Sequence, residues 1–328
     1  MAIRSVFGHS RSRRGGAVTA VLAVTAFAAV GPAAAADATP TGPGDGAGSK
    51  PTVVLVHGAF ADASGWNGVT ERLQREGYNV VVPANPLRGL AGDSAYIASV
   101  LKAIQGPIVL VGHSYGGAVI SSAAAGNPSV KSLVYIAAFM PDKGEALGQL
   151  AAKFLGSELG TALKQSPFRN ADGSNGTDLS IQLAKFREVF AADLPAATTA
   201  VMARSQRPIS ASALMDKAPA AAWRTIPSWS MIATGDKTIP PDLERFGAKR
   251  AGSHTVEVNS SHVAMLSHPD AVTDLIRQAA AGRPPAKPAL ADTGPSTLAL
   301  AGFGAAATAM VLTGAGLVLS SRRRGPAR

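Results

Sequence analysis

The 328-residue sequence contains no cysteine, which excludes thiol nucleophiles, Cys-ligated zinc and disulfide bonds together. Aromatic residues make up only 5% of the chain and charged residues 16%. The formal charge of +10 is concentrated at the two ends, because eight Arg lie in residues 1–14 and 322–328. The rest of the chain has 23 basic residues against 21 acidic ones. This balance, with few side chains that could stack on bases, predicts no nucleic-acid partner.

Residues 1–36 have the pattern of a secretory signal. A basic start is followed by an apolar stretch from Ala17 to Val30 and then by small residues up to Ala36. The apolar run is short for a membrane helix, so we expect export, with cleavage by signal peptidase after Ala36. The pair Arg13-Arg14 leaves the general and the twin-arginine export routes both open. Residues 37–49 are rich in Gly and Pro and predict a flexible linker.

The C-terminal region has three features in a fixed order. Residues 283–295 form a Pro-rich spacer that contains the pentapeptide Leu290-Ala291-Asp292-Thr293-Gly294. Residues 296–319 carry no charge and are long enough to cross a bilayer as a transmembrane helix. Residues 320–328 contain an Arg cluster that would stay in the cytoplasm, which places the preceding domain outside the membrane.

This order of pentapeptide, apolar span and basic tail resembles the LAxTG cell-wall sorting signal of actinobacteria. The resemblance implies that a sortase cuts between Thr293 and Gly294 and joins Thr293 to the peptidoglycan precursor. A plain membrane anchor through residues 296–319 is the alternative. In both cases we expect a protein at the cell surface.

The region from residue 50 to 282 alternates short, β-branched apolar runs with longer amphipathic segments. This alternation predicts an α/β fold: a doubly wound, mostly parallel sheet that is covered by helices on both faces. The expected strands are Thr52–His57, Asn79–Val82, Ile108–Gly112, Leu133–Ala137, Trp229–Ala233 and Thr255–Val258. The expected helices are Asn67–Glu76, Ser94–Ile104, Tyr115–Ala125, Pro241–Ala251 and Pro269–Ala279.

Residues 141–226 interrupt this rhythm, because they contain no convincing strand. Helical patterns cover Ile181–Ala191 and Ala196–Arg204, and Arg169–Gly176 is a loop rich in Gly, Asn and Ser. Insertions of this length between two strands normally carry function. We therefore expect a helical cap in this interval.

A candidate nucleophile lies in the pentapeptide Gly112-His113-Ser114-Tyr115-Gly116, which follows an apolar strand and precedes a helix. This is the setting that the G-x-S-x-G nucleophile elbow requires. The glycines let the strand and the helix approach closely, while the serine lies on a strained turn that exposes its Oγ. The pattern predicts Ser114 as the nucleophile.

A serine nucleophile needs a base and an acid that orients the base, each placed after a later strand. Asp236 and His262 follow two later strands in this order, and we predict them as the acid and the base. Asp142, which follows an earlier strand, is the rival acid. His268 lies at the start of the last helix, where a capping or hydrogen-bonding role is favoured.

The oxyanion that forms during acyl transfer needs two backbone N–H donors. One is expected from Tyr115, the residue after the nucleophile. The other is expected from the loop HGAF that follows the first strand, where Ala59 is the first choice and Phe60 the alternative. Four apolar residues near these motifs fit either an acyl pocket or the core: Phe60, Trp66, Phe139 and Met140.

From Lys50 to about Ala280 the chain resembles the α/β-hydrolase superfamily. The stretches VLVHGAF, VLVGHSYGG, VYIAAFMPD, IATGDKTIPP and SSHVAMLSHP are similar to bacterial homologues of plant methyl-ester esterases and hydroxynitrile lyases. The resemblance implies a triad of Ser114, His262 and Asp236, a cap over the pocket and no cofactor. The related lyases have a Lys after the catalytic His, where this chain has Val263, so cyanohydrin cleavage is disfavoured. A serine nucleophile also excludes the epoxide hydrolases and haloalkane dehalogenases of this fold, which use Asp.

These features predict a secreted serine hydrolase, a carboxylesterase for small or medium apolar esters. We expect no metal, because no His and carboxylate residues have the spacing of metal ligands. Two alternatives stay open: a non-catalytic surface-binding module on the same fold, and a cofactor-free perhydrolase that forms a peracid at the same serine.

Overall fold

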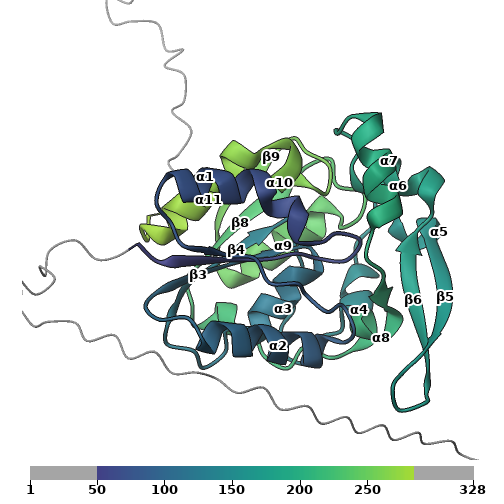
Figure 1. Cartoon of the computed structure of the whole chain (residues 1–328), viewed down its shortest axis with the longest axis horizontal. Helices are drawn as coiled ribbons and strands as arrows, with labels where there is room; N and C mark the ends of the chain where they lie inside the picture. The colour runs from purple at the N-terminus through teal and green to yellow at the C-terminus, as the bar shows by residue number, and fades with distance from the viewer. Residues whose placement is uncertain (1–49, 284–328) are drawn as a thin grey trace, which may run out of the picture. The chain divides into compact units, whose positions relative to one another are not determined.

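The computed structural model describes residues 50–283, and its central element is a six-stranded parallel sheet (Figure 1). The strands lie in the order β2-β1-β3-β4-β8-β9, so the direction of winding reverses between β1 and β3. In open parallel sheets, ligands bind at the carboxyl ends of the strands near such a reversal. The strand bounds are β1 Thr52–Val56, β2 Val80–Val81, β3 Ile108–His113, β4 Val130–Ile136, β8 Ser228–Ala233 and β9 His254–Val258.

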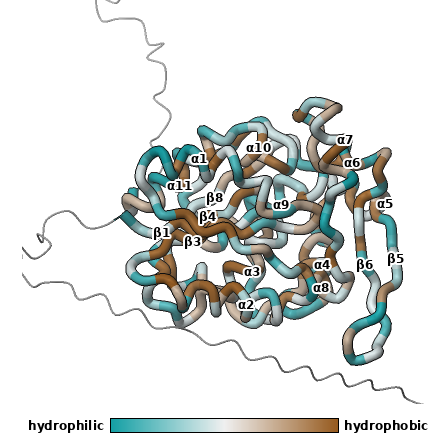
Figure 2. The backbone as a smooth tube through the Cα atoms, in the orientation of Figure 1, coloured by the Kyte–Doolittle hydropathy of each residue, from teal (hydrophilic) through white to brown (hydrophobic). Residues whose placement is uncertain are grey.

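The sheet is buried between two layers of helices. Every residue of β1 and β3 is buried, and the brown colour of these strands and of β4 in Figure 2 marks them as the apolar centre. Helices α1 and α11 pack against each other on one face, and α2 and α3 cover the other face (Figure 1). The helix bounds are α1 Asn67–Arg75, α2 Leu90–Lys102, α3 Tyr115–Ala123, α9 Pro241–Ala251, α10 Ala264–Ser267 and α11 Pro269–Ala280.

The predicted α/β fold is confirmed, and its six strands and five helices outside the cap are all present. Their ends differ from the predicted ones by at most four residues, as at α2, which begins at Leu90 rather than Ser94. The long apolar strands were predictable because a strand buried on both faces needs apolar residues at consecutive positions.

The cap between β4 and β8 is not purely helical, so this part of the prediction is wrong. It contains a three-stranded antiparallel sheet in the order β5-β6-β7, and the predicted loop Arg169–Gly176 forms the turn of its β5–β6 hairpin. The hairpin lacks a strand signal because it is mostly polar and exposed, and Pro167 lies within it. The cap elements are α4 Leu147–Ala151, α5 Leu159–Ala162, β5 Leu163–Arg169, β6 Asn175–Ile181, α6 Leu183–Phe190, α7 Ala196–Ser205, β7 Ile209–Ser210 and α8 Ala211–Met215.

The predicted signal peptide and linker of residues 1–49 lie outside the described residues, as do residues 284–328 with the predicted sorting motif, span and tail. Within residues 50–283, no helix has both the length and the apolar character needed to cross a membrane. Arg283 ends the described chain, and its carbonyl oxygen accepts a hydrogen bond from the Trp229 indole of β8 at 3.0 Å.

Candidate active site

Ser114 lies at a sharp turn between β3 and α3. Its φ of 56° and ψ of −125° are rare for a residue other than glycine, and such strain is typical of a nucleophile elbow. A Cβ on Gly112 would lie 2.6 Å from the carbonyl oxygen of Gly116, so only glycine permits this approach of strand and helix. The strand, turn and helix predicted around Ser114 are therefore present.

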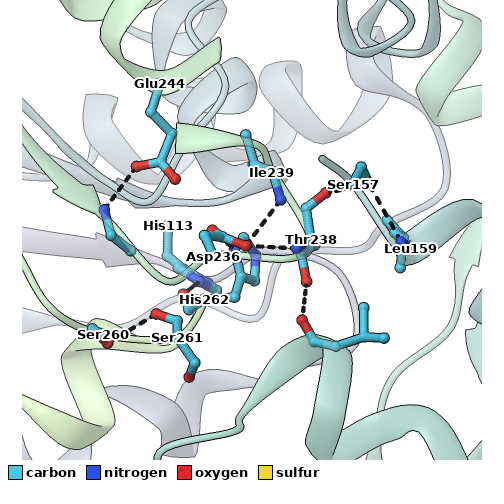
Figure 3. Close-up of polar contacts among 12 residues, drawn as sticks. His113, Ser157, Leu159, Asp236, Thr238, Ile239, Glu244, Ser260, Ser261 and His262 are labelled. Carbon is cyan, nitrogen blue, oxygen red and sulfur yellow. Dashed lines mark hydrogen bonds and ion pairs between the residues drawn. The ribbon is translucent and has the colours of Figure 1, made fainter. Parts of the chain in front are cut away.

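The structure brings Asp236 and His262 into direct contact (Figure 3). Asp236 lies in the loop after β8 and His262 in the loop after β9, and both side chains are fully buried. The Nδ1 atom of His262 lies 2.5 Å from Oδ2 of Asp236. Because an ionised carboxylate only accepts hydrogen bonds, this contact assigns the proton to Nδ1 and leaves Nε2 as the basic nitrogen.

Backbone N–H groups fix the orientation of the Asp236 carboxylate. Its Oδ1 accepts hydrogen bonds from the N–H groups of Thr238 at 2.6 Å and Ile239 at 3.0 Å. The loop that carries Asp236 is also bonded to the His262 loop, since the N–H of Gly235 donates to the carbonyl oxygen of Ser260 at 3.0 Å. The candidate acid and the candidate base are thus held by one connected pair of loops.

His113, which directly precedes Ser114, is hydrogen-bonded to the backbone of His262. Its Nε2–H donates to the carbonyl oxygen of His262 at 2.9 Å, and the two imidazole rings lie 4.7 Å apart. Burial, together with the neighbouring His262, holds the pKa of His113 well below its usual value, so this ring stays neutral. Within residues 50–283, the buried Nε2 of His262 has no hydrogen-bond partner, so its lone pair is free to accept a proton.

The backbone distinguishes the two candidates for the second oxyanion donor. The N–H of Phe60 donates to the carbonyl oxygen of Arg207 at 3.0 Å and is already used. The N–H of Ala59 makes no backbone hydrogen bond within residues 50–283. Tyr115 begins α3, where N–H groups of the first turn have no acceptor in the helix. Ala59 and Tyr115 therefore fit the pair of donors better than Phe60 and Tyr115.

Gly58 lies directly against the candidate nucleophile. A Cβ at this position would lie 2.6 Å from the Cβ of Ser114 and 2.7 Å from the carbonyl oxygen of His113. We expect Gly58→Ala to displace Ser114 and to slow its labelling by a fluorophosphonate about 100-fold, the cost of misplacing a reacting atom by roughly 1 Å. Gly92→Ala on α2 is the matched control, because the space around Gly92 is open. Equal labelling of the Gly58→Ala variant and the parent would contradict this prediction.

The rival acid and the rival histidine have other partners. The carboxylate of Asp142 pairs with the guanidinium of Arg224, whose Nε lies 2.9 Å from Oδ1. This bond holds the pKa of Asp142 below its usual value. His268 directly precedes α11, and its Nδ1 lies 2.9 Å from the hydroxyl of Ser267. Neither residue contacts the Asp236 and His262 pair through a hydrogen bond in the described part of the chain.

Contacts from the cap hold the two loops that carry Asp236 and His262. The sequence analysis did not predict these contacts. Asp193, between α6 and α7, accepts hydrogen bonds from the N–H of Ser261 at 3.0 Å and from its hydroxyl. Burial acts to raise the pKa of Asp193, but these hydrogen bonds outweigh it, and the pKa lies below its usual value. On the other loop, the hydroxyl of Thr238 donates to the carbonyl oxygen of Val189 at 2.9 Å. No motif marks these residues, because only the folded cap brings them to the site.

Aromatic side chains enclose the site. The Phe190 ring of α6 lies 5.1 Å from the His262 ring and 6.1 Å from the Phe60 ring, between centroids. Ser114 is only 4% exposed. The cap therefore covers the candidate nucleophile and base, and it surrounds them with apolar groups.

The four apolar residues predicted as pocket or core residues have different places. Phe60 lies beside the site, as its contact with Phe190 shows. Trp66 and Met140 are buried in the core, and Phe139 packs against it while partly exposed. Core packing is thus the observed role of the last three.

Comparison with known proteins also indicates a hydrolase. The model of the Alpha/beta hydrolase family matches residues 53–275. The chain belongs to this family. It is similar to the pyrethroid hydrolase of Sphingobium wenxiniae, with 26% identity over 274 residues, which cover 74% of this chain and 95% of the relative.

Two solved structures share the fold. Polyneuridine aldehyde esterase has a TM-score of 0.61 and 19% identity, over 70% of this chain and 99% of that chain. The methylesterase MES16 from Arabidopsis has a TM-score of 0.58 and 17% identity, over 71% of this chain and 99% of that chain. The predicted similarity to plant methyl-ester esterases is therefore confirmed at the level of the fold.

Proposed function

We propose that this hydrolase cleaves small or medium apolar carboxylic esters through an acyl-enzyme on Ser114. The buried hydrogen bond between Asp236 and His262, beside the strained Ser114 turn, is the observation that carries the proposal. The similar proteins are a pyrethroid hydrolase and two esterases, which supports an ester as the bond that is cleaved.

The proposed mechanism uses these groups in order. His262 Nε2 takes the proton of Ser114 as its Oγ attacks the ester carbonyl carbon, and Asp236 stabilises the imidazolium that forms. The N–H groups of Ala59 and Tyr115 bind the oxyanion. His262 then protonates the leaving alkoxide, and later it activates the water that releases the acid from Ser114.

A cavity of about 230 Å³ beside the site supports the proposed substrate size. Phe60 and Val263, the chain neighbours of the proposed oxyanion donor and base, line it together with Met202, Met265 and Leu266. The cavity is smaller than most sites for drug-sized ligands, so short acyl or alcohol groups fit it. A larger hollow of about 540 Å³ lies near α2 and the end of α3. None of the proposed catalytic residues lines either cavity, but only the smaller one is lined by their chain neighbours.

A panel of p-nitrophenyl and methyl esters of increasing acyl length tests the proposal. We expect kcat/KM of the purified protein to be highest for short or medium acyl chains and to fall once the chain exceeds the cavity. A rise up to the longest acyl chain would contradict the proposed substrate class. Absence of turnover on every ester would contradict esterase activity itself.

We also propose that the enzyme is exported and held at the cell surface. This proposal rests on the sequence alone: the signal pattern of residues 1–36, the pentapeptide at residues 290–294 and the uncharged residues 296–319 with the Arg cluster behind them. Signal peptidase and a sortase are then partners during export, and the C-terminus is attached to peptidoglycan or, in the alternative, to the membrane.

Thr293→Ala tests the attachment. We expect this variant to lose covalent attachment to the wall, because the sortase forms its thioester with the carbonyl group of Thr293 and reads its side chain. Asp292→Asn, at the variable position of the pentapeptide, is the matched control and should stay attached. Mass spectrometry of lysozyme-released protein should give a C-terminal peptide that ends at Thr293. A peptide that continues through Gly294 would contradict wall attachment and support the membrane anchor.

A further inference from the structure

Glu244 places a second carboxyl group at the Asp236 and His262 pair. It lies in the first turn of α9 and is 2% exposed, and Figure 3 shows it entering the site from that helix. Its Oε2 accepts a hydrogen bond from the N–H of Ala233 at 3.1 Å. In addition to burial, the negative charge of Asp236 lies close enough to raise the pKa of Glu244. Its Oε1 is buried and has no hydrogen-bond partner within residues 50–283.

Counting the hydrogen-bond sites of Asp236 indicates a proton between the carboxyl groups of Asp236 and Glu244. A carboxylate offers about four lone-pair sites. Asp236 uses three of them for the N–H groups of Thr238 and Ile239 and for Nδ1–H of His262. Two ionised carboxylates cannot form a hydrogen bond, because neither has a proton to donate. The remaining site of Asp236 therefore fits a proton on Oε1 of Glu244.

The surroundings favour the neutral acid. The small void beside Glu244 has no room for a water molecule, and it is lined by residues such as Tyr135 and Met140. Burial first, and then the negative charge of Asp236, raise the pKa of Glu244 well above its usual value. The Tyr135 hydroxyl of β4 does not compensate, since its hydrogen bond is with Ser121.

The positive charge of Arg245 acts to lower the pKa of Glu244, but it does not outweigh burial and Asp236. Arg245 follows Glu244 on α9, but its guanidinium is bonded to Glu257 of β9 at 2.8 Å and to Asp242 at 2.9 Å. His262, from the loop after β9, faces Asp236 rather than Glu244. The two carboxyl groups therefore share one negative charge between them.

We propose that Glu244 is a positioning residue for the proposed hydrolysis, which stays protonated and donates a hydrogen bond to Asp236 so that the carboxylate stays aligned with His262. The inference rests on the proposed function of that pair. Loss of the Glu244 proton at alkaline pH would place two negative charges in contact and displace Asp236. Gln can replace the protonated form, because its N–H₂ donates to Asp236 while its oxygen accepts from Ala233.

Two variants separate this role from simple packing. We expect Glu244→Leu, which fills similar space but cannot donate, to slow inactivation by a fluorophosphonate roughly 10- to 100-fold, as expected when a buried acceptor loses its donor. Glu244→Gln should retain most of the neutral-pH rate and should lack the fall in rate that the parent shows at alkaline pH. An alkaline fall that is the same in Glu244→Gln and the parent, or full reactivity of Glu244→Leu, would overturn the proposal.

The pH dependence of unfolding provides a second measurement that does not depend on catalysis. Because the folded-state pKa of Glu244 is raised, Glu244 lowers the free energy of unfolding at higher pH. This destabilisation is absent below the unfolded-state pKa and grows as pH rises toward the folded-state value. Glu244→Gln should therefore be more stable than the parent, with a ratio of unfolding constants that increases by up to about tenfold per pH unit in this window. In an Asp236→Asn background this gain should shrink, since the second carboxylate is absent.

The outcomes distinguish the inference from the proposed function. A parent protein that does not react with the fluorophosphonate at all would overturn the proposed function, while the unfolding measurement would still decide whether Glu244 donates a proton to Asp236. A difference in stability between Glu244→Gln and the parent that does not change with pH would overturn the inference, even if the parent is an active esterase.

Discussion

Ser114→Ala is expected to abolish both fluorophosphonate labelling and ester hydrolysis while the fold stays intact. Removal of the nucleophile from a triad typically lowers kcat by about 10⁶-fold. The fold should tolerate the change, because Ser114 is held by its backbone: its N–H donates to the carbonyl oxygen of Ile136 at 3.3 Å, and its own carbonyl oxygen accepts from Gly117 at 3.0 Å. Neither bond involves the side chain, so circular dichroism and the melting temperature should match those of the parent.

A second serine on the helix that follows provides the control. Ser122 lies on α3, and its hydroxyl donates to the carbonyl oxygen of Ala220 at 3.3 Å, away from His262. Ser122→Ala should keep parental labelling and turnover. If Ser114→Ala is still labelled at the parental rate, the nucleophile lies elsewhere and the proposed mechanism is wrong.

The sheet was predictable because its physical requirements are local. Strands such as β1 and β3 are covered on both faces, so consecutive positions must be apolar, and turn residues mark their ends. The cap hairpin follows a different rule. Most residues of β5 are partly or fully exposed, so no apolar alternation is selected, and the pairing with β6 forms through backbone hydrogen bonds that the residue types do not reveal.

The site also contains residues that the sequence predicts and residues that it does not. Ser114, Asp236 and His262 follow ordered strands of a known topology, so chain order alone places them at one edge of the sheet, and the structure brings the last two into contact. Asp193 and Glu244 carry no such marker. Asp193 reaches the site only through the packing of the cap, and Glu244 only through the packing of α9. The distances from Asp193 to Ser261 and from Glu244 to Asp236 are set by the folded chain and not by a sequence motif.

Asp236→Asn is expected to lower turnover by about 10⁴-fold, because the imidazole is then held in the wrong tautomer. The N–H groups of Thr238 and Ile239 would keep the side-chain oxygen of the introduced amide, which directs the amide N–H₂ group at Nδ1 of His262. Two donors cannot bond, so the ring proton moves to Nε2, and that nitrogen can no longer accept the proton of Ser114.

Asp142→Asn is the matched comparison, since it makes the same chemical change in the rival acid. It removes an ion pair with Arg224 in which the Asp142 side chain is 26% exposed, a contact of about 0–1 kcal/mol to stability. We expect its kcat/KM on p-nitrophenyl acetate to stay within about threefold of the parent, as for an exposed charge away from the reacting atoms. A large loss in Asp142→Asn with near-normal turnover in Asp236→Asn would move the acid to the loop after β4, and the hydrogen bond between Asp236 and His262 would then be structural.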